Sequence, residues 1–344
     1  MHAHTPTPDN VHAIRSAIVA QGQALRSRYP LLEHQDALGL GILLFALLGI
    51  AATSLAWVNG LVPWWVCLLL NTVFISLTQE VEHDLLHSLY FKKNRWMHNL
   101  MLALTWVARP STVNPWVRRR MHMRHHQLSG TEQDVEERGL SNGYPWGILR
   151  LFMVADLMLA STVLVAQATT WKTRGELLWL GFKAFFPVAM LTWGLWYVFL
   201  LFHGLNLLFA VSGTPQPWSP DTLGLMHLID GLVVVLIAPN MLWSFCLHFI
   251  SSNMHYYGDI EPSNVAQQTQ VLNAWWLWPL HLFCFNFGAT HGIHHFVVSE
   301  PFYIRQLTAT AAHAAMKANG VRFNDFASWR RANRWAQRKP GTPA

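Results

Sequence analysis

Four apolar stretches, each about as long as a bilayer-spanning helix, constrain the fold of this chain most strongly. A hydrocarbon core about 30 Å thick is crossed by a helix of roughly 20 apolar residues. The composition agrees with a membrane protein, because 52% of the 344 residues are hydrophobic and only 12% are charged. We therefore expect an all-α integral membrane protein with four transmembrane helices, at Leu38 to Val58, Leu61 to Thr78, Leu178 to Phe209 and Met226 to Phe249.

Two further apolar stretches are poorer candidates for spans. Residues 97–107 form a run only about two-thirds as long as a bilayer needs, and arginines flank it, so we expect a re-entrant or interfacial segment. Residues 147–170 are longer, but they contain Arg150 and Asp156. Because charged groups are costly inside a bilayer, we favour a helix on the membrane surface over a span.

The distribution of basic residues predicts the orientation of the chain. The loops at 59–60 and 211–224 contain no Lys or Arg, whereas residues 92–150 and the carboxy-terminal tail contain many. Loops rich in Lys and Arg stay on the cytoplasmic side, which is the inner side of a cell membrane. We expect residues 1–36 to be a cytosolic amino-terminal segment without a signal peptide, 37–305 to be the membrane domain, and 306–344 to be a cytosolic basic tail.

Nine histidines fall into four places in the sequence. They are His83 and His87 in HDLLH, His122, His125 and His126 in HMRHH, the lone His255 in NMHYYG, and His291, His294 and His295 in HGIHH. Residues three or four apart share one face of a helix, so each box can present its imidazoles to one point. Two HxxHH patterns exceed what 19 histidines would give by chance. Since imidazole suits iron, copper, zinc and nickel, we predict a metal site.

A metal site built from all four places requires them on the same side of the membrane. A fifth span at residues 272–289 would carry the last box to the opposite face. We therefore expect these residues to form a helix embedded in the cytoplasmic interface or in the protein itself. Three tryptophans near its start would then lie at headgroup level.

Acidic residues near the boxes are candidates for orienting the imidazole rings, as they do in other metal sites. We select Asp84, within the first box, and Asp134, shortly after the second, and add Asn253 and Asn286 as amide candidates. The other acids that follow the second box are expected to form a solvated face that balances nearby arginines; they are Glu132, Glu136 and Glu137.

Histidines and cysteines outside the boxes are expected to be structural. The histidines lie in apolar stretches and are expected to be hydrogen-bonded core residues rather than ligands; they are His98, His203, His227, His248 and His281. The three cysteines lie singly in apolar surroundings, which excludes a disulfide framework and a CxxC motif; they are Cys67, Cys246 and Cys284.

The four histidine motifs, in this order and with two spans between the second and third, resemble the membrane-bound di-iron fatty acid desaturase and hydroxylase superfamily. The resemblance covers residues from about 38 to 305. It implies that the nine histidines bind two Fe²⁺ ions in a cytosolic cap on four transmembrane helices. It also implies O2 as co-substrate, an external electron donor, and a fatty acyl or related lipid substrate taken from the bilayer.

The family includes more than one reaction, and the sequence leaves the reaction open. We rank desaturation or hydroxylation of a fatty acyl chain first, and oxidative decarboxylation of free fatty acids to terminal 1-alkenes second. A zinc membrane peptidase is disfavoured, because HDLLH lacks the glutamate of HExxH and nine histidines exceed the three ligands of a catalytic zinc site. A metal transporter is also disfavoured, because it would need polar residues spread through its spans, whereas here they cluster at one face. Nucleic acid is excluded as a partner because the basic residues cluster in loops.

The sequence also indicates where the electron donor and the substrate bind. The chain has no flavin fingerprint and no four-cysteine cluster, so we expect a ferredoxin-like carrier to dock on a basic face that contains Arg118, Arg119, Arg120 and Arg331. We expect a substrate tunnel between the second, third and fourth spans, lined by Phe185, Phe186, Trp193, Leu242 and Phe245. A polar pair of His203 and Asp230 would close its outer end.

Overall fold

The computed structural model describes residues 7–131, 133–141, 143–261 and 263–336, and this part of the chain is helical. It contains no strand, and its β pairing consists of isolated bridges between His255 and Thr269 and between Val271 and Phe323. The predicted all-α class is therefore confirmed.

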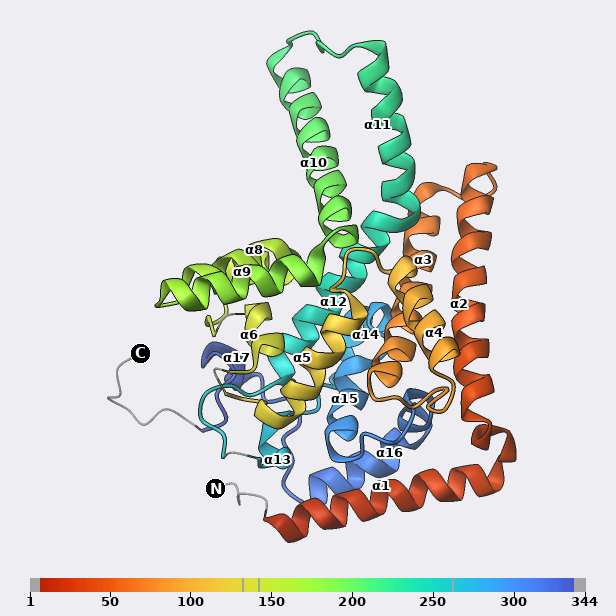
Figure 1. Ribbon diagram of the computed structural model, residues 1–344, viewed down its shortest axis with the longest axis vertical. Coiled ribbons are helices and arrows are strands. Elements are labelled where there is room, and N and C mark those ends of the chain that lie inside the picture. The colour runs from red at the N-terminus through yellow and green to blue at the C-terminus, as the bar shows by residue number, and fades with distance from the viewer. Residues whose placement is uncertain (1–6, 132, 142, 262, 337–344) are drawn as a thin grey trace.

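Within the described residues, four helices are long and apolar enough to cross a membrane, as predicted, and a bent pair described below would be a fifth if it formed one span. The four helices are α2 (Gln35–Val58), α3 (Trp64–Leu86), α10 (Val188–Ser212), and the continuous run of α11 (Pro220–Leu232), a π-helical stretch (Val233–Ile237) and α12 (Ala238–Met254). The loops that join α2 to α3 and α10 to α11 lie at the same end of the molecule (Figure 1). The two hairpins contact each other through α3, where the Asn71 side chain donates to the Val235 carbonyl at 2.8 Å.

The predicted start of the third span at Leu178 is wrong. Residues up to Phe185 belong to a separate helix, α9 (Trp171–Phe185), and α10 begins only at Val188. Pro187 lies between the two helices. Proline has no N–H to continue a helix, so it separates two apolar helices that periodicity alone joins into one.

The stretch predicted as one surface helix at 147–170 is instead a bent pair. Helices α7 (Ile148–Ala155) and α8 (Leu157–Ala166) meet at an angle of 119°. Asp156 lies at the bend and caps α8, because its carboxylate accepts from the Leu159 N–H at 2.9 Å. In Figure 1, α8 and α9 lie together on one side of the body and cover α6 (Val135–Ser141).

The described parts of both terminal regions, residues 7–36 and 306–336, contact the rest of the molecule. Helix α1 (Pro8–Arg28) lies along α16 (Phe302–Ala318), and the predicted domain boundary at residue 305 falls inside α16 (Figure 1). Arg26 and Glu300 form an ion pair at 2.6 Å. The remaining elements are a 3₁₀ turn (Pro30–Glu33), α4 (Arg95–Ala108), α5 (Pro115–Leu128), α13 (Val265–Gln268), a second 3₁₀ turn (Trp275–Leu277), α14 (Trp278–Phe283), α15 (Phe287–Phe296) and α17 (Ala327–Arg330).

The predicted helix at residues 272–289 is also wrong, because the chain breaks twice there. The second 3₁₀ turn leads into the short α14, and α15 begins after Phe285 and Asn286, whose φ angles are 47° and 58°. Helix α15 then packs closely on its neighbours at Gly288. A Cβ at that position would lie 2.7 Å from the His281 ring and 2.8 Å from the Ile250 side chain, so only glycine fits.

Candidate metal centre

Ring nitrogens of eight predicted ligands converge in two clusters. The first histidine group consists of His83, His87, His122 and His294, with one nitrogen from each within 4.8 Å of the others. His83 lies in the last turn of α3, and His87 directly follows that helix. His122 comes from α5, and His294 comes from α15. The Nε2 atom of His87 lies 2.9 Å from the Nε2 atoms of both His122 and His294.

The second histidine group consists of His125, His255, His291 and His295, and all four are buried. His125 comes from α5, and His255 directly follows α12 in extended backbone. His291 and His295 lie one turn apart on α15, with their Nε2 atoms 3.1 Å from each other. The Nε2 atoms of His125 and His255 are buried and have no hydrogen-bond partner.

The ninth predicted ligand, His126, adjoins the first histidine group. Its Nε2 atom lies 3.2 Å from that of His122 and 3.1 Å from that of His294. The structure therefore brings all nine predicted histidines together, from four segments that are far apart in the sequence.

Acidic and amide side chains hold three rings of the second histidine group by their Nδ1 atoms. Asp134 lies 2.8 Å from Nδ1 of His125. Nδ1 of His255 lies 2.9 Å from the Ser251 carbonyl and 3.1 Å from the Glu137 carboxylate. The amide oxygen of Gln268 lies 3.1 Å from Nδ1 of His295. The orienting role predicted for Asp134 matches this geometry.

Among the described residues, a carboxylate holds one ring of the first histidine group in the same way. Glu136 lies 3.1 Å from Nδ1 of His122. Nδ1 of His294 is buried without a partner, and His87 is only partly buried. Glu136 and Glu137 were expected to belong to a solvated face, but each side chain is only 17% exposed and contacts a ring. Glu132 lies outside the described residues.

Asp84 does not orient a ring, contrary to prediction. Its nearest oxygen is 3.9 Å from Nδ1 of His83, which is too far for a hydrogen bond. Adjacent residues on a helix do not face each other, so its carboxylate points elsewhere. It accepts from Arg305 at 3.0 Å and from the Phe302 N–H and the Tyr90 hydroxyl, each at 2.8 Å. Asp84 thus fastens α3 to α16.

The two predicted amide residues also contact no imidazole. Asn253 accepts from Arg150 at 3.0 Å and donates to the Phe249 carbonyl at 2.8 Å. Asn286 donates to Gln306 at 3.0 Å, in the bend before α15. Both residues stabilise the backbone around the site rather than the rings themselves.

Burial keeps most of these imidazoles neutral. Desolvation, followed by the proximity of His122, lowers the pKa of His87 to about 2. Desolvation and neighbouring histidines hold the pKa of His294 and of His295 well below the usual range. His125 differs, because burial lowers its pKa but the charge of Asp134 outweighs burial and raises it to about 9.

This donor set fits a pair of metal ions. Carboxylates only accept hydrogen bonds, so the partners of His122, His125 and His255 require Nδ1 of each ring to carry the proton. In each neutral ring Nε2 then presents a lone pair to other ring nitrogens a few ångströms away, and His125 does so once it loses its second proton. Such an arrangement is repulsive unless a cation lies between them. Imidazole ligands of this kind suit first-row transition metals.

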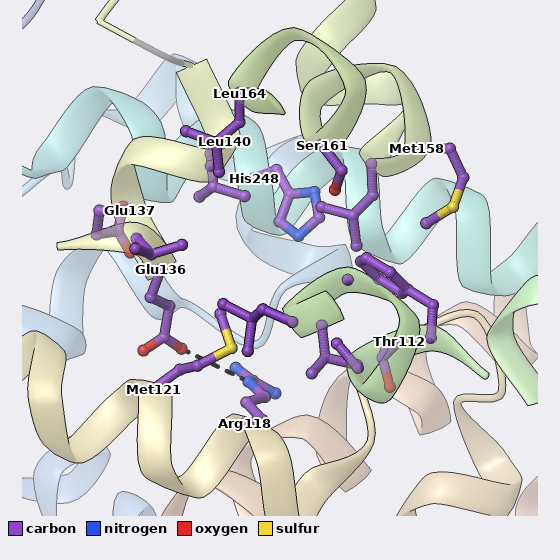
Figure 2. A pocket seen from close by; sticks show the side chains of 18 of the residues that line it. Thr112, Arg118, Met121, Glu136, Glu137, Leu140, Met158, Ser161, Leu164 and His248 are labelled. Atoms are coloured by element: carbon purple, nitrogen blue, oxygen red, sulfur yellow. Dashed lines mark ion pairs between the residues drawn. The ribbon is translucent and has the colours of Figure 1, made fainter. Parts of the chain in front are cut away.

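Both histidine groups open on a cavity of about 820 Å³. His83 and His122 of the first group and His125 and His291 of the second line it, together with apolar side chains of α5, α6, α8, α9 and α12. Figure 2 shows Met121, Leu140, Met158 and Leu164 around this space. A cavity of this size accommodates one extended small ligand.

The predicted tunnel lies in the wrong place. Of the predicted lining residues, Phe185 borders the cavity beside the histidines, which runs beneath α8 and α9. Phe186 lines a second hollow of about 800 Å³ between α10 and the fourth span, which contains no histidine of either group. His203 and Asp230 do form the predicted pair, at 2.9 Å, but their side chains are 44% and 38% exposed and neither borders the cavity.

A family model described as fatty acid desaturase matches residues 59–327, a range that includes both histidine groups and His126. The chain belongs to the fatty acid desaturase family. No curated protein matches it. Membership of this family makes the chain an oxidoreductase of fatty acid metabolism, and its four long apolar helices agree with a membrane protein.

Other histidines of this desaturase-family chain are separate from the two groups. Nδ1 of His98 lies 3.0 Å from the Tyr90 carbonyl, and Nδ1 of His248 lies 3.3 Å from the Ser244 hydroxyl. His281 is in contact range of Gly288, as described above. His98 is hydrogen-bonded as expected. Both ring nitrogens of His281 are instead buried without a hydrogen-bond partner among the described residues, and His248 lines the cavity (Figure 2).

Part of the basic face proposed for docking is buried. Arg118 forms ion pairs with Glu82 and Glu136 and lines the cavity, so it is not available to a partner. Glu82 also pairs with the buried Arg109 at 2.6 Å. Arg119 donates to Ser88 and Arg331 pairs with Asp325, whereas Arg120 is exposed.

Proposed function

We propose that the chain uses O2 to oxidise an unactivated C–H bond of a fatty acyl or related lipid chain, by desaturation or hydroxylation. The observation that carries the proposal is the opening of two four-histidine groups on one largely apolar cavity. The family supports the substrate class. We assign the nine histidines as ligands of two Fe²⁺ ions, which supply O2 activation when bound.

The protein's own residues position the ligands and the substrate. Asp134, Glu136 and Glu137 fix the rings of His125, His122 and His255, so that each Nε2 faces the metal position. Apolar side chains from α8, α9 and α12 exclude water from the cavity and hold an acyl chain beside the histidines. Apolar contacts hold every part of an acyl chain about equally well. The length of the cavity therefore determines which carbon lies beside the histidines.

Electrons must come from outside this reaction centre. Desaturation of one C–C bond by O2 releases two molecules of water and consumes two electrons and two protons beyond those of the substrate. We propose a small ferredoxin-like carrier as the donor, docking near the exposed Arg120. We further propose that both termini and the histidine groups face the cytoplasm, because the loops at the opposite end lack Lys and Arg.

The proposal is tested by supplying a deuterated free fatty acid to cells that express the protein, then analysing lipids and headspace. An unsaturated or hydroxylated product that requires O2 is expected. Cells that express a variant with His294→Ala serve as the matched negative control. A terminal alkene one carbon shorter would establish oxidative decarboxylation instead. No oxygen-dependent product from fatty acids, alkanes or isoprenoids would refute lipid oxidation.

A further inference from the structure

The cavity beside the histidines is lined by two arginines in different situations. Arg118 is saturated, because it pairs with Glu82 and Glu136 and also donates to Gln79 at 3.1 Å. The ion pair between Arg118 and Glu136 is drawn in Figure 2. Because these partners already occupy the N–H donors of Arg118, few donors remain to bind the head group of a ligand.

Arg174 also lines the cavity but has no acidic partner among the described residues. Its Nε atom donates to the Ala168 carbonyl at 3.0 Å, and its guanidinium stands 4.9 Å from the centre of the Trp171 ring. These two contacts fix the plane of the group. Among the described residues, neither terminal nitrogen of Arg174 has a protein acceptor, and these are the nitrogens that bind a carboxylate or phosphate bidentately.

Arg174 lies at the part of the cavity that is remote from α5. The far end of α9 touches the start of α5, because the Asn114 N–H donates to the Ala184 carbonyl at 2.7 Å. Arg174 is in the first turn of α9 and Phe185 is its last residue, so the helix separates their Cα atoms by about 16 Å. In Figure 1 the beginning of α9 projects away from α3 and α15, which carry histidines.

We propose that Arg174 binds the anionic head group of the lipid substrate, a carboxylate or a phosphate, at the end of the cavity away from the histidines. This inference rests on the proposed function and gives it a substrate class. The acyl chain then runs beneath α8 and α9 toward the metal centre. The reacting carbon lies along the chain rather than next to the head group, which favours desaturation or hydroxylation over loss of the carboxyl carbon.

Equilibrium binding tests the inference without requiring turnover. Purified protein in nanodiscs is titrated with a saturated fatty acid, its methyl ester, a lysophosphatidic acid and an acyl-CoA of the same chain length. The variants are R174Q, the conservative R174K, and K172Q, which removes an exposed charge two residues away. Loss of a charge-assisted hydrogen bond should weaken binding of the anionic ligand about 10- to 100-fold in R174Q.

The ligand that responds identifies the source of the anion. If R174Q binds only the fatty acid more weakly than the wild type does, the head group is a free carboxylate. If R174Q binds only a phosphate-bearing lipid more weakly, the head group is a phosphate. R174K should retain part of the affinity, and K172Q and methyl ester binding should not change. Unchanged binding of every anion by R174Q, or an equal loss for the ester, would overturn the inference.

The same samples separate this inference from the proposed function. Selective loss of anion binding in R174Q together with no lipid oxidation by the wild type would refute the function and leave Arg174 as a binding residue. Normal oxidation by the wild type with unchanged acid binding in R174Q would refute the role of Arg174 alone. If R174Q places the double bond or hydroxyl group at several carbons instead of one, this result would further support head-group binding by Arg174.

Discussion

The two histidine groups have the same number of imidazoles but differ in how firmly their rings are held. In the second group all four histidines are buried, and Asp134, Glu137 and Gln268 each hold one ring by Nδ1. In the first group one carboxylate, Glu136, holds one ring, and His87 is only partly buried. Since outer partners fix ring orientation and raise ligand basicity, we infer that the second position is more preorganised for its metal.

Removing one ligand from either group should have the largest effect. We expect H125A and H294A to lose turnover, and the iron content to fall from about two to about one per chain, because each variant removes a ligand from one group and leaves the other group complete. Metal analysis and product assays of the purified variants measure both quantities. H98A and H281A are the controls and should retain iron, since their rings lie outside both groups. Full iron and turnover in H125A and H294A would refute the ligand assignment.

Removing the orienting carboxylates should reveal the difference between the groups. D134N should weaken iron binding at the second group by about 10- to 100-fold. E136Q should weaken iron binding at the first group by a smaller factor, because Glu136 is more exposed than Asp134 and also forms an ion pair with Arg118. Competition with a chelator at equilibrium gives both affinities. Equal losses in the two variants would mean that ring orientation does not distinguish the groups.

A chelator should remove the two metals in two phases. The first group should lose its ion sooner, because partly exposed His87 gives the chelator access. Stopped-flow absorbance of a coloured iron chelator follows both phases, and D134N should accelerate only the slow one. A single phase in the wild type would contradict the comparison.

Replacing Gln268 should have the smallest effect. A neutral hydrogen bond contributes about 0.5–1.5 kcal/mol, so Q268L should weaken iron binding at the second group by only a few-fold. The same competition titration measures it. A loss as large as that of D134N would show that burial, rather than the charge of the partner, determines how strongly a ring is held.

The sequence was sufficient for the parts of the molecule that depend on spacing and hydrophobic length. Four apolar runs predicted the four long helices, and the three histidine boxes with His255 predicted which side chains would meet. Both are properties of single segments. Residues three or four apart lie on the same face of a helix, so the histidines of one box come together independently of the rest of the fold.

The features that were missed depend on how segments meet. Gln268 reaches His295 across 27 residues and carries no motif that marks it. Glu136 and Glu137 resemble any charged surface helix until α6 is placed over α5. The cavity depends on how α8 and α9 pack over α6 and α12, and the apolar pattern of residues 178–209 does not mark the break at Pro187 that separates α9 from α10.

Metal quantification together with Mössbauer spectroscopy on protein loaded with iron tests the central claim most directly. The account predicts about two irons per chain, in two inequivalent nitrogen-rich environments that report the unequal support of the first and second histidine groups. Turnover should be absent from the metal-free protein and return with ferrous iron. One metal per chain, or zinc that sustains full activity, would contradict the account.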